Sequence, residues 1–94
     1  MKGAKTMSER FFLYDDLEDT KTRFVSFMGD NQRFDLALIR SDRYYGKQLV
    51  LDIQGSRFAI IGTDDLDEEG YLEHVFQLEE EDAAELRSFL YEVI

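Results

Sequence analysis

The sequence predicts one α+β domain: a mainly antiparallel, curved β-meander of about six strands with one C-terminal α-helix packed on it. Three observations lead to this fold class. Short runs rich in aromatic and β-branched residues follow one another, separated by single glycines and polar turns. Only the last segment has helical spacing. No strand–helix–strand pattern supports a parallel crossover, so we expect an antiparallel sheet, either open or partly closed into a barrel.

The strands are expected within a single domain over residues 8–94. Residues 1–7 have no apolar pattern, so we treat them as a flexible tail. The segment 22–28 has apolar side chains on both faces, so we expect it at the centre of the sheet or covered on both sides. The predicted strands are short apolar or alternating runs that end at polar turns: residues 11–14, 22–28, 34–39, 48–53, 58–61 and 71–78.

The turns and the helix have their own signals. Residues 54–56 fit a three-residue hairpin loop in which Gly55 takes a positive φ. The C-terminal segment places apolar residues at helical spacing, on one stripe: Leu86, Phe89, Leu90 and Val93. Four acidic residues precede or occupy its first turn, where the helix dipole favours negative charge. We therefore expect a helix of about 14 residues at the end of the chain.

The composition restricts the class of protein. The 94 residues include no cysteine, which excludes a disulfide scaffold, a cysteine-based zinc site and a thiol nucleophile. No apolar run approaches the roughly 20 residues of a membrane span. The first residues contain no apolar signal-peptide region. We expect a cytoplasmic protein without a membrane partner.

Charge is distributed unevenly along the chain, whose formal net charge is −10. Residues 58–94 carry twelve acidic side chains and one basic one, whereas residues 1–57 are nearly neutral. The acidic part should repel nucleic acids and anionic membranes, and attract cations or basic protein surfaces. Strong net charge generally serves solubility, and this rule favours a surface that only keeps the protein in solution.

One turn gathers the candidate partner-binding residues: Arg40, Arg43, Tyr44, Tyr45 and Lys47. Arginine and tyrosine are enriched at the energetic centres of protein interfaces. The same residue types stack on single-stranded nucleic acid, although the negative net charge disfavours that partner. A third interpretation is that these are ordinary turn residues whose cations pair with the acidic part of the chain.

The acidic stretch 64–73 is a candidate cation site. Oxygen ligands at Asp65, Asp67, Glu69 and Glu73 follow the early positions of an EF-hand loop. The twelfth position, where a bidentate glutamate is required, is Phe76. The alternative is a solvated acidic loop.

An enzyme based on this loop is the second functional hypothesis. It would use the carboxylates of residues 64–73 and His74, the only histidine, which we expect on an apolar strand face. A general base needs a positioned partner, and none is evident. The sequence has no Gly-x-Ser-x-Gly elbow and no glycine-rich phosphate loop, so we expect no cofactor.

Three segments carry a family resemblance: Ser8–Asp16, Arg33–Ala37 and Tyr71–Phe76. In the overall sequence of these segments, the chain resembles a small family of cytosolic proteins of unknown function from Bacillus-type (Firmicute) bacteria. The resemblance covers residues 8–94. The resemblance implies a cytoplasmic location and transfers no catalytic residue.

The leading hypothesis is a non-enzymatic protein-binding or regulatory module. Its expected contacts are the arginine–tyrosine turn and an exposed edge strand, which could also pair two copies into a homodimer. The identity of the protein partner is left open.

Overall fold

The computed structural model describes residues 9–94. The tail predicted at residues 1–7 lies outside the described residues. Within them, the first stretch, residues 9–20, contains no helix or strand. We call this stretch the N-terminal arm.

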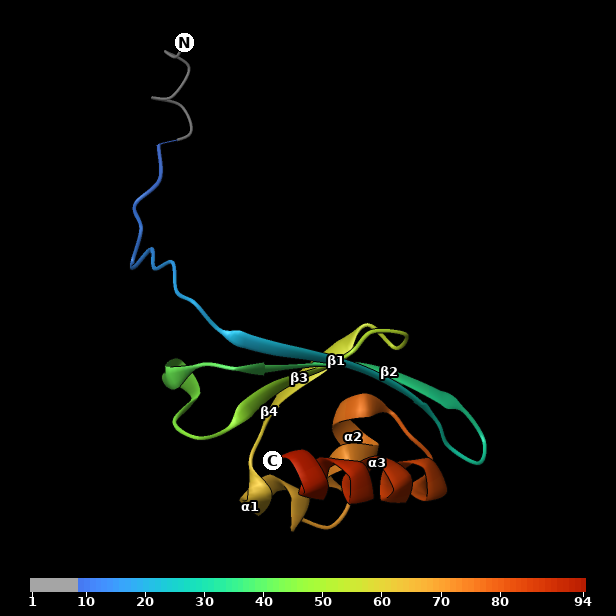
Figure 1. The fold of residues 1–94 in the computed structure, drawn as a ribbon. Helices are drawn as coiled ribbons and strands as arrows, with labels where there is room; N and C mark the ends of the chain where they lie inside the picture. The colour runs from blue at the N-terminus through green and yellow to red at the C-terminus, as the bar shows by residue number, and fades with distance from the viewer. Residues whose placement is uncertain (1–8) are drawn as a thin grey trace.

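The described residues form one antiparallel sheet with helices on a single face (Figure 1). The strands lie in chain order: β1 (Lys21–Met28), β2 (Arg33–Arg40), β3 (Gln48–Asp52) and β4 (Arg57–Ile61). A short 3-10 helix, η2 (Asp42–Tyr44), connects β2 to β3. Three α-helices follow the sheet: α1 (Thr63–Leu66), α2 (Tyr71–Phe76) and α3 (Glu80–Val93). No helix among the described residues is long and apolar enough to cross a membrane.

The α+β class, the antiparallel meander and the C-terminal helix are confirmed, but the expected six strands and the barrel are wrong. Residues 9–94 contain four strands in an open sheet, with β1 and β4 at its edges. The run 22–28 was expected at the centre or covered on both sides. It belongs instead to the edge strand β1, and Phe24 on its free face is 74% exposed.

The segment predicted as a strand over 71–78 is the helix α2. Leu72 and Phe76 are buried four residues apart, on one side of a helical turn, while His74 between them is exposed. The same side chains alternate at a period of two, so the sequence pattern fits a strand equally well. Positive φ values at Gly70 and Gln77 begin and end the helix, and this restricts it to two turns.

The β3–β4 loop also differs from its prediction. The positive φ belongs to Ser56, at 57°, and not to Gly55. The backbone N–H of Gly55 donates to the Asp52 carboxylate at 3.2 Å, and a β-carbon at residue 55 would collide with that carboxylate. A β-carbon at position 55 would therefore displace the Asp52 carboxylate, so glycine is favoured there because of a close approach and not because of its φ.

The core lies between the sheet and the helices. Alternate residues of β2, namely Phe34, Leu36 and Leu38, are buried there against the predicted helix stripe, of which Leu86 and Leu90 are fully buried. The ring of Phe27 lies 5.0 Å, between centroids, from the rings of both Phe34 and Phe89. Hydrogen bonds hold α3 against the sheet layer. The Asp30 N–H, in the β1–β2 turn, donates to Glu85 at 2.9 Å, the Asn31 amide beside it donates to Glu81 at 3.3 Å, and the Gln48 amide donates to the carbonyl oxygen of Val93 at 3.0 Å.

Candidate functional site

The basic turn between β2 and β3 lies at one end of the sheet. The Ser41 hydroxyl accepts the backbone N–H of Arg43 at 3.2 Å and begins η2. Positive φ values at Tyr45 and Gly46 then reverse the chain. Tyr45 is 93% exposed, whereas Tyr44 is half-buried.

Arg43 binds the N-terminal arm. Its guanidinium donates to Glu18 at 2.8 Å and to Asp16 at 3.3 Å, and lies over the ring of Tyr14 at 5.5 Å from the centroid. Glu18 also accepts the Ser41 hydroxyl. The hydrogen bond from Ser41, together with Arg43, lowers the pKa of Glu18 below its ordinary value. These contacts fix the base of the arm beside the turn.

Lys47 binds the acidic part of the chain instead. Its ammonium lies 3.0 Å from Asp65 and 3.4 Å from Asp64, and these hydrogen bonds raise the pKa of Lys47. Asp65 also accepts the backbone N–H of Gly62 at 2.9 Å, which stabilises the start of α1. Partial burial acts to raise the pKa of Asp65, but the Gly62 N–H and the Lys47 charge outweigh it, so this pKa lies below its ordinary value.

The other candidate cation ligands lie on the helical side of the molecule. Asp67 accepts the phenol of Tyr91, which raises the pKa of that tyrosine. Glu73 accepts a hydrogen bond from Arg87 at 3.3 Å. Asp67, Glu69 and Glu73 all line one shallow hollow on this side, and Glu69 is exposed at its border. Among residues 9–94, no group of three or more histidines and carboxylates is arranged to hold a metal ion.

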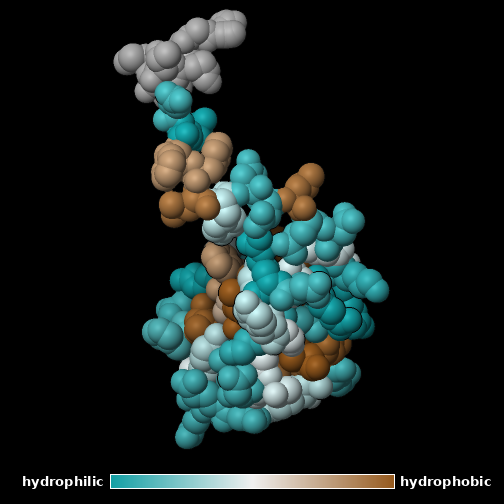
Figure 2. Space-filling model, turned by 90° about the vertical axis from the view of Figure 1, so that its left-hand side faces the viewer, coloured by the Kyte–Doolittle hydropathy of each residue, from teal (hydrophilic) through white to brown (hydrophobic). Residues whose placement is uncertain are grey.

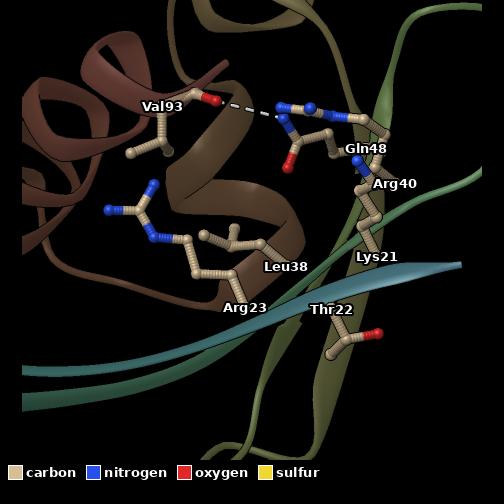
Figure 3. Close-up of a pocket in the computed structure, with 7 residues that line it drawn as sticks. All are labelled: Lys21, Thr22, Arg23, Leu38, Arg40, Gln48 and Val93. Carbon is tan, nitrogen blue, oxygen red and sulfur yellow. Dashed lines mark hydrogen bonds between the residues drawn. The ribbon is translucent and has the colours of Figure 1, made fainter.

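Arg40 lines a half-open cavity of about 180 Å³ between the sheet and the end of α3 (Figure 3). Lys21 and Arg23 of β1 join it there, and neither residue was singled out from the sequence. Within the described residues, none of these three cations has a carboxylate within 4.0 Å, the distance limit for an ion pair. The carbonyl groups of a helix C-terminus are partly negative, and the three cations line the same cavity as Val93 at the end of α3.

The five residues predicted for partner binding therefore divide among three environments. Arg43 holds the arm, Lys47 holds α1, and Arg40 faces the end of α3. Tyr44 and Tyr45 are left at the rim of the sheet. Tyr44 borders a shallow hollow shared with Leu49 of the sheet.

One exposed apolar surface is the face of the sheet away from the helices, which we call the outer face. Two cross-strand rows form most of it, in register: Phe24–Ala37–Leu51–Phe58 and Thr22–Ile39–Leu49–Ile60. Phe24 and Phe58 are 74% and 69% exposed, and Met28, Ile53 and Ile60 are exposed beside them. A sheet face in contact with water is normally polar, so this face is unusual.

The N-terminal arm is a second exposed apolar feature. Figure 2 shows its apolar side chains as tan and brown atoms that stand clear of the domain, next to the teal atoms of charged residues. Five of its large apolar residues are exposed: Phe11, Phe12, Leu13, Tyr14 and Leu17. The prediction of a strand over 11–14 was wrong for the single chain, since no described strand pairs with this segment.

These features define a small α+β protein with an open antiparallel sheet, one face of which is covered by helices while the other is largely apolar and exposed. A family model described as SAV0927-like matches residues 13–92, and the chain belongs to this family. The match includes most of the arm. A comparison with curated proteins gives no match. The description of the family names no activity or partner, so the function has to be argued from the surfaces.

Proposed function

We propose that this protein is a small, non-enzymatic protein-binding module of the cytosol, and that the outer face of its sheet is the binding surface. One observation carries the proposal: β3 and β4 turn their larger apolar side chains outward. On β3, Leu49 and Leu51 lie on the outer face, while the polar Gln48 faces the helices. On β4, Phe58 lies outward in the same way.

An apolar sheet face that is exposed to water lowers the stability of a monomer. Single exposed apolar residues are common, but contiguous patches beyond about 300–600 Å² usually mark an interaction site. The two rows of the outer face are contiguous because their members pair across all four strands. The exposure of this face therefore supports an interface in the functional assembly that removes its apolar side chains from water.

The arginine–tyrosine turn extends this surface at one end. Tyr44 lies near Ile39 and Leu49 of the outer face, and Tyr45 projects beyond it. Tyrosine contributes strongly to interfaces because it combines a large apolar ring with a hydrogen-bonding group. We assign the two tyrosines to the border of the binding surface.

The two alternative functions have less support. An enzyme based on residues 64–73 would need free carboxylates, but Asp65 and Glu73 are held by Lys47 and Arg87. A nucleic-acid binder would need free cations at the turn, but Arg43 is held by the arm, Lys47 is held by Asp65, and Arg40 faces the end of α3. The cytosolic location and the Firmicute origin remain expectations from the sequence resemblance.

The test compares three tagged baits in cytosol of the source organism, with bound proteins quantified by mass spectrometry. The baits are the wild type, an outer-face variant (Phe24→Ser with Phe58→Ser) and a helical-side control (Glu69→Ser with Glu92→Ser), whose sites are exposed. We expect partners, including untagged copies of the chain, on the wild type and the control, with at least about a tenfold loss on the outer-face variant. Equal capture by all three baits would contradict the proposal. Circular dichroism checks that each bait is folded.

A further inference from the structure

We infer that the occupant of the outer face is the N-terminal arm of a second copy of this chain, exchanged reciprocally in a two-fold symmetric dimer. The inference rests on the proposed function of the outer face and names its partner. Two large apolar features stay exposed within the described part of one chain: the outer part of the arm, Phe11–Leu13, and most of the outer face, which the base of the arm borders only beside Ile39 and Leu49. In a two-fold dimer, each arm would cover the other copy's face, so both features are buried at once.

The exposed area is sufficient for a stable dimer. A large side chain buries about 150–250 Å² when it is fully covered. From the exposed fractions, the arm residues beyond the anchored base, Phe11, Phe12 and Leu13, present about 450 Å², and the five exposed residues of the outer face about 600 Å². A stable interface takes about 800 Å² from each partner. Reciprocal exchange uses both features of each chain and exceeds this requirement.

The base of the arm directs it away from its own domain. Arg43 holds Asp16, Glu18 and the Tyr14 ring at the end of the sheet, so residues 9–13 leave the domain there. Figure 1 shows the arm leaving on the side of the sheet opposite the helices. Phe11 and Leu13 are about nine-tenths exposed as a result, at 91% and 89%. A second copy facing this side of the sheet would meet these residues.

Charge favours the sheet over the helices as the arm's binding site. The arm carries five acidic residues and one basic one, whereas residues 21–61 carry seven basic and four acidic side chains. Residues 62–94 carry twelve acidic side chains and one basic one. Most cations of the sheet layer lie on its helical face or pair within their own chain. The acidic arm is therefore repelled by the helical layer of another copy and meets no such repulsion at the outer face. Its aromatic residues then match the apolar rows of the outer face.

Cross-linking between differently labelled chains tests the inference directly. The chain has no cysteine, so single introduced cysteines react cleanly. Leu13→Cys in one full-length chain is mixed with Phe58→Cys in another, and a short bis-maleimide is added. We expect a cross-linked heterodimer between the arm and the outer face. Ala84→Cys, exposed on α3, replaces Phe58→Cys as the matched control and should give none.

Light scattering after size exclusion, over a range of protein concentrations, provides the second measurement. We expect a dimer for the wild type, and about a 100-fold or greater rise in Kd for an arm variant (Phe12→Ser with Leu13→Ser) and for the outer-face variant. A mixture of the two variants should form heterodimers, since one intact arm then meets one intact face. Each variant is checked by circular dichroism for a folded domain.

Three results would overturn the inference. An arm variant that dimerises like the wild type would show that the outer faces pack on each other, and the proposed function would stand without the arm. A cross-link that forms only within a chain carrying both Leu13→Cys and Phe58→Cys would show that the arm binds its own face. A wild type that stays monomeric at millimolar concentration would exclude exchange, while capture of a foreign protein by the outer face would still support the proposed function.

Discussion

Two phenylalanines on opposite faces of the sheet should respond very differently to the same substitution. Phe34 on β2 faces the helices, is 2% exposed and stacks on Phe27 at 5.0 Å. Phe58 on β4 faces outward and is 69% exposed. Both lie in strands, so replacement by alanine removes a favourable strand residue in either case. The difference between the two variants therefore reports burial.

The expected losses of unfolding free energy follow from these exposures. Phe34→Ala removes a buried ring and leaves a cavity, which costs about 3–5 kcal/mol. Phe58 is about one-third covered, so Phe58→Ala should cost a similar fraction of the 1.5–3 kcal/mol for full burial, about 0.5–1 kcal/mol. A domain of this size has a total stability of about 5–15 kcal/mol, so the first loss is large and the second small.

Urea unfolding followed by far-UV circular dichroism measures both losses. At low protein concentration, where the chains are monomeric, we expect Phe34→Ala to lower the unfolding free energy by about 2–4 kcal/mol more than Phe58→Ala does. At high concentration, Phe58→Ala should cost more, because the dimer adds stability that this variant lacks. Phe34→Leu serves as a folded control, with an expected cost below about 1.5 kcal/mol. Equal losses for Phe34→Ala and Phe58→Ala at low concentration would refute the assignment of the outer face as bare.

Two further predictions concern local contacts. Asp65→Asn should cost about 1 kcal/mol, because it weakens the bonds to the Gly62 N–H and to Lys47. The pKa of Asp65 is lowered in the folded state, so its contribution is present above its ordinary value of 3.8 and disappears as the pH falls below it. Thermal melts of the wild type between pH 5 and pH 2 should therefore fall more steeply than those of the variant, and parallel curves would contradict this. Ser56→Gly should raise the unfolding free energy by about 0.5 kcal/mol, since relief of the left-handed conformation exceeds the added freedom of the unfolded chain. Gly55→Ser is its control and should be destabilising because of the Asp52 carboxylate, so a stabilising result there would argue against this loop geometry.

Much of the fold was predictable because local patterns were unambiguous. The runs 22–28, 34–39, 48–53 and 58–61 are strands in the structure, and the stripe from Leu86 to Val93 forms α3. The errors occurred where one pattern fits two structures. The segment 71–78 places Leu72 and Phe76 four residues apart, which satisfies both the strand period and the helix period.

The candidate site was predictable only in part. Sequence proximity brought together Arg40, Arg43 and Lys47, but each one contacts a different element in the structure. The pairing of Lys47 with Asp65 agrees with the interpretation that some of these cations pair with the acidic part of the chain. One signal in the sequence could have identified Lys21 and Arg23. They continue the every-second-residue spacing of Val25 and Phe27, so they lie on the face of β1 that points toward the core.

The sequence by itself determined the class of the domain, its antiparallel connectivity and its terminal helix, because these depend on local periodicity and short turns. Only the tertiary structure decided which face of the sheet the helices cover. On β3, the alternation of Leu49 and Leu51 with Val50 offers an apolar side in either direction. The register with β2 places Val50 beside Leu38, and the helices cover that side. A period of two shows that a strand has two faces but does not show which face is buried. Long-range packing decides that.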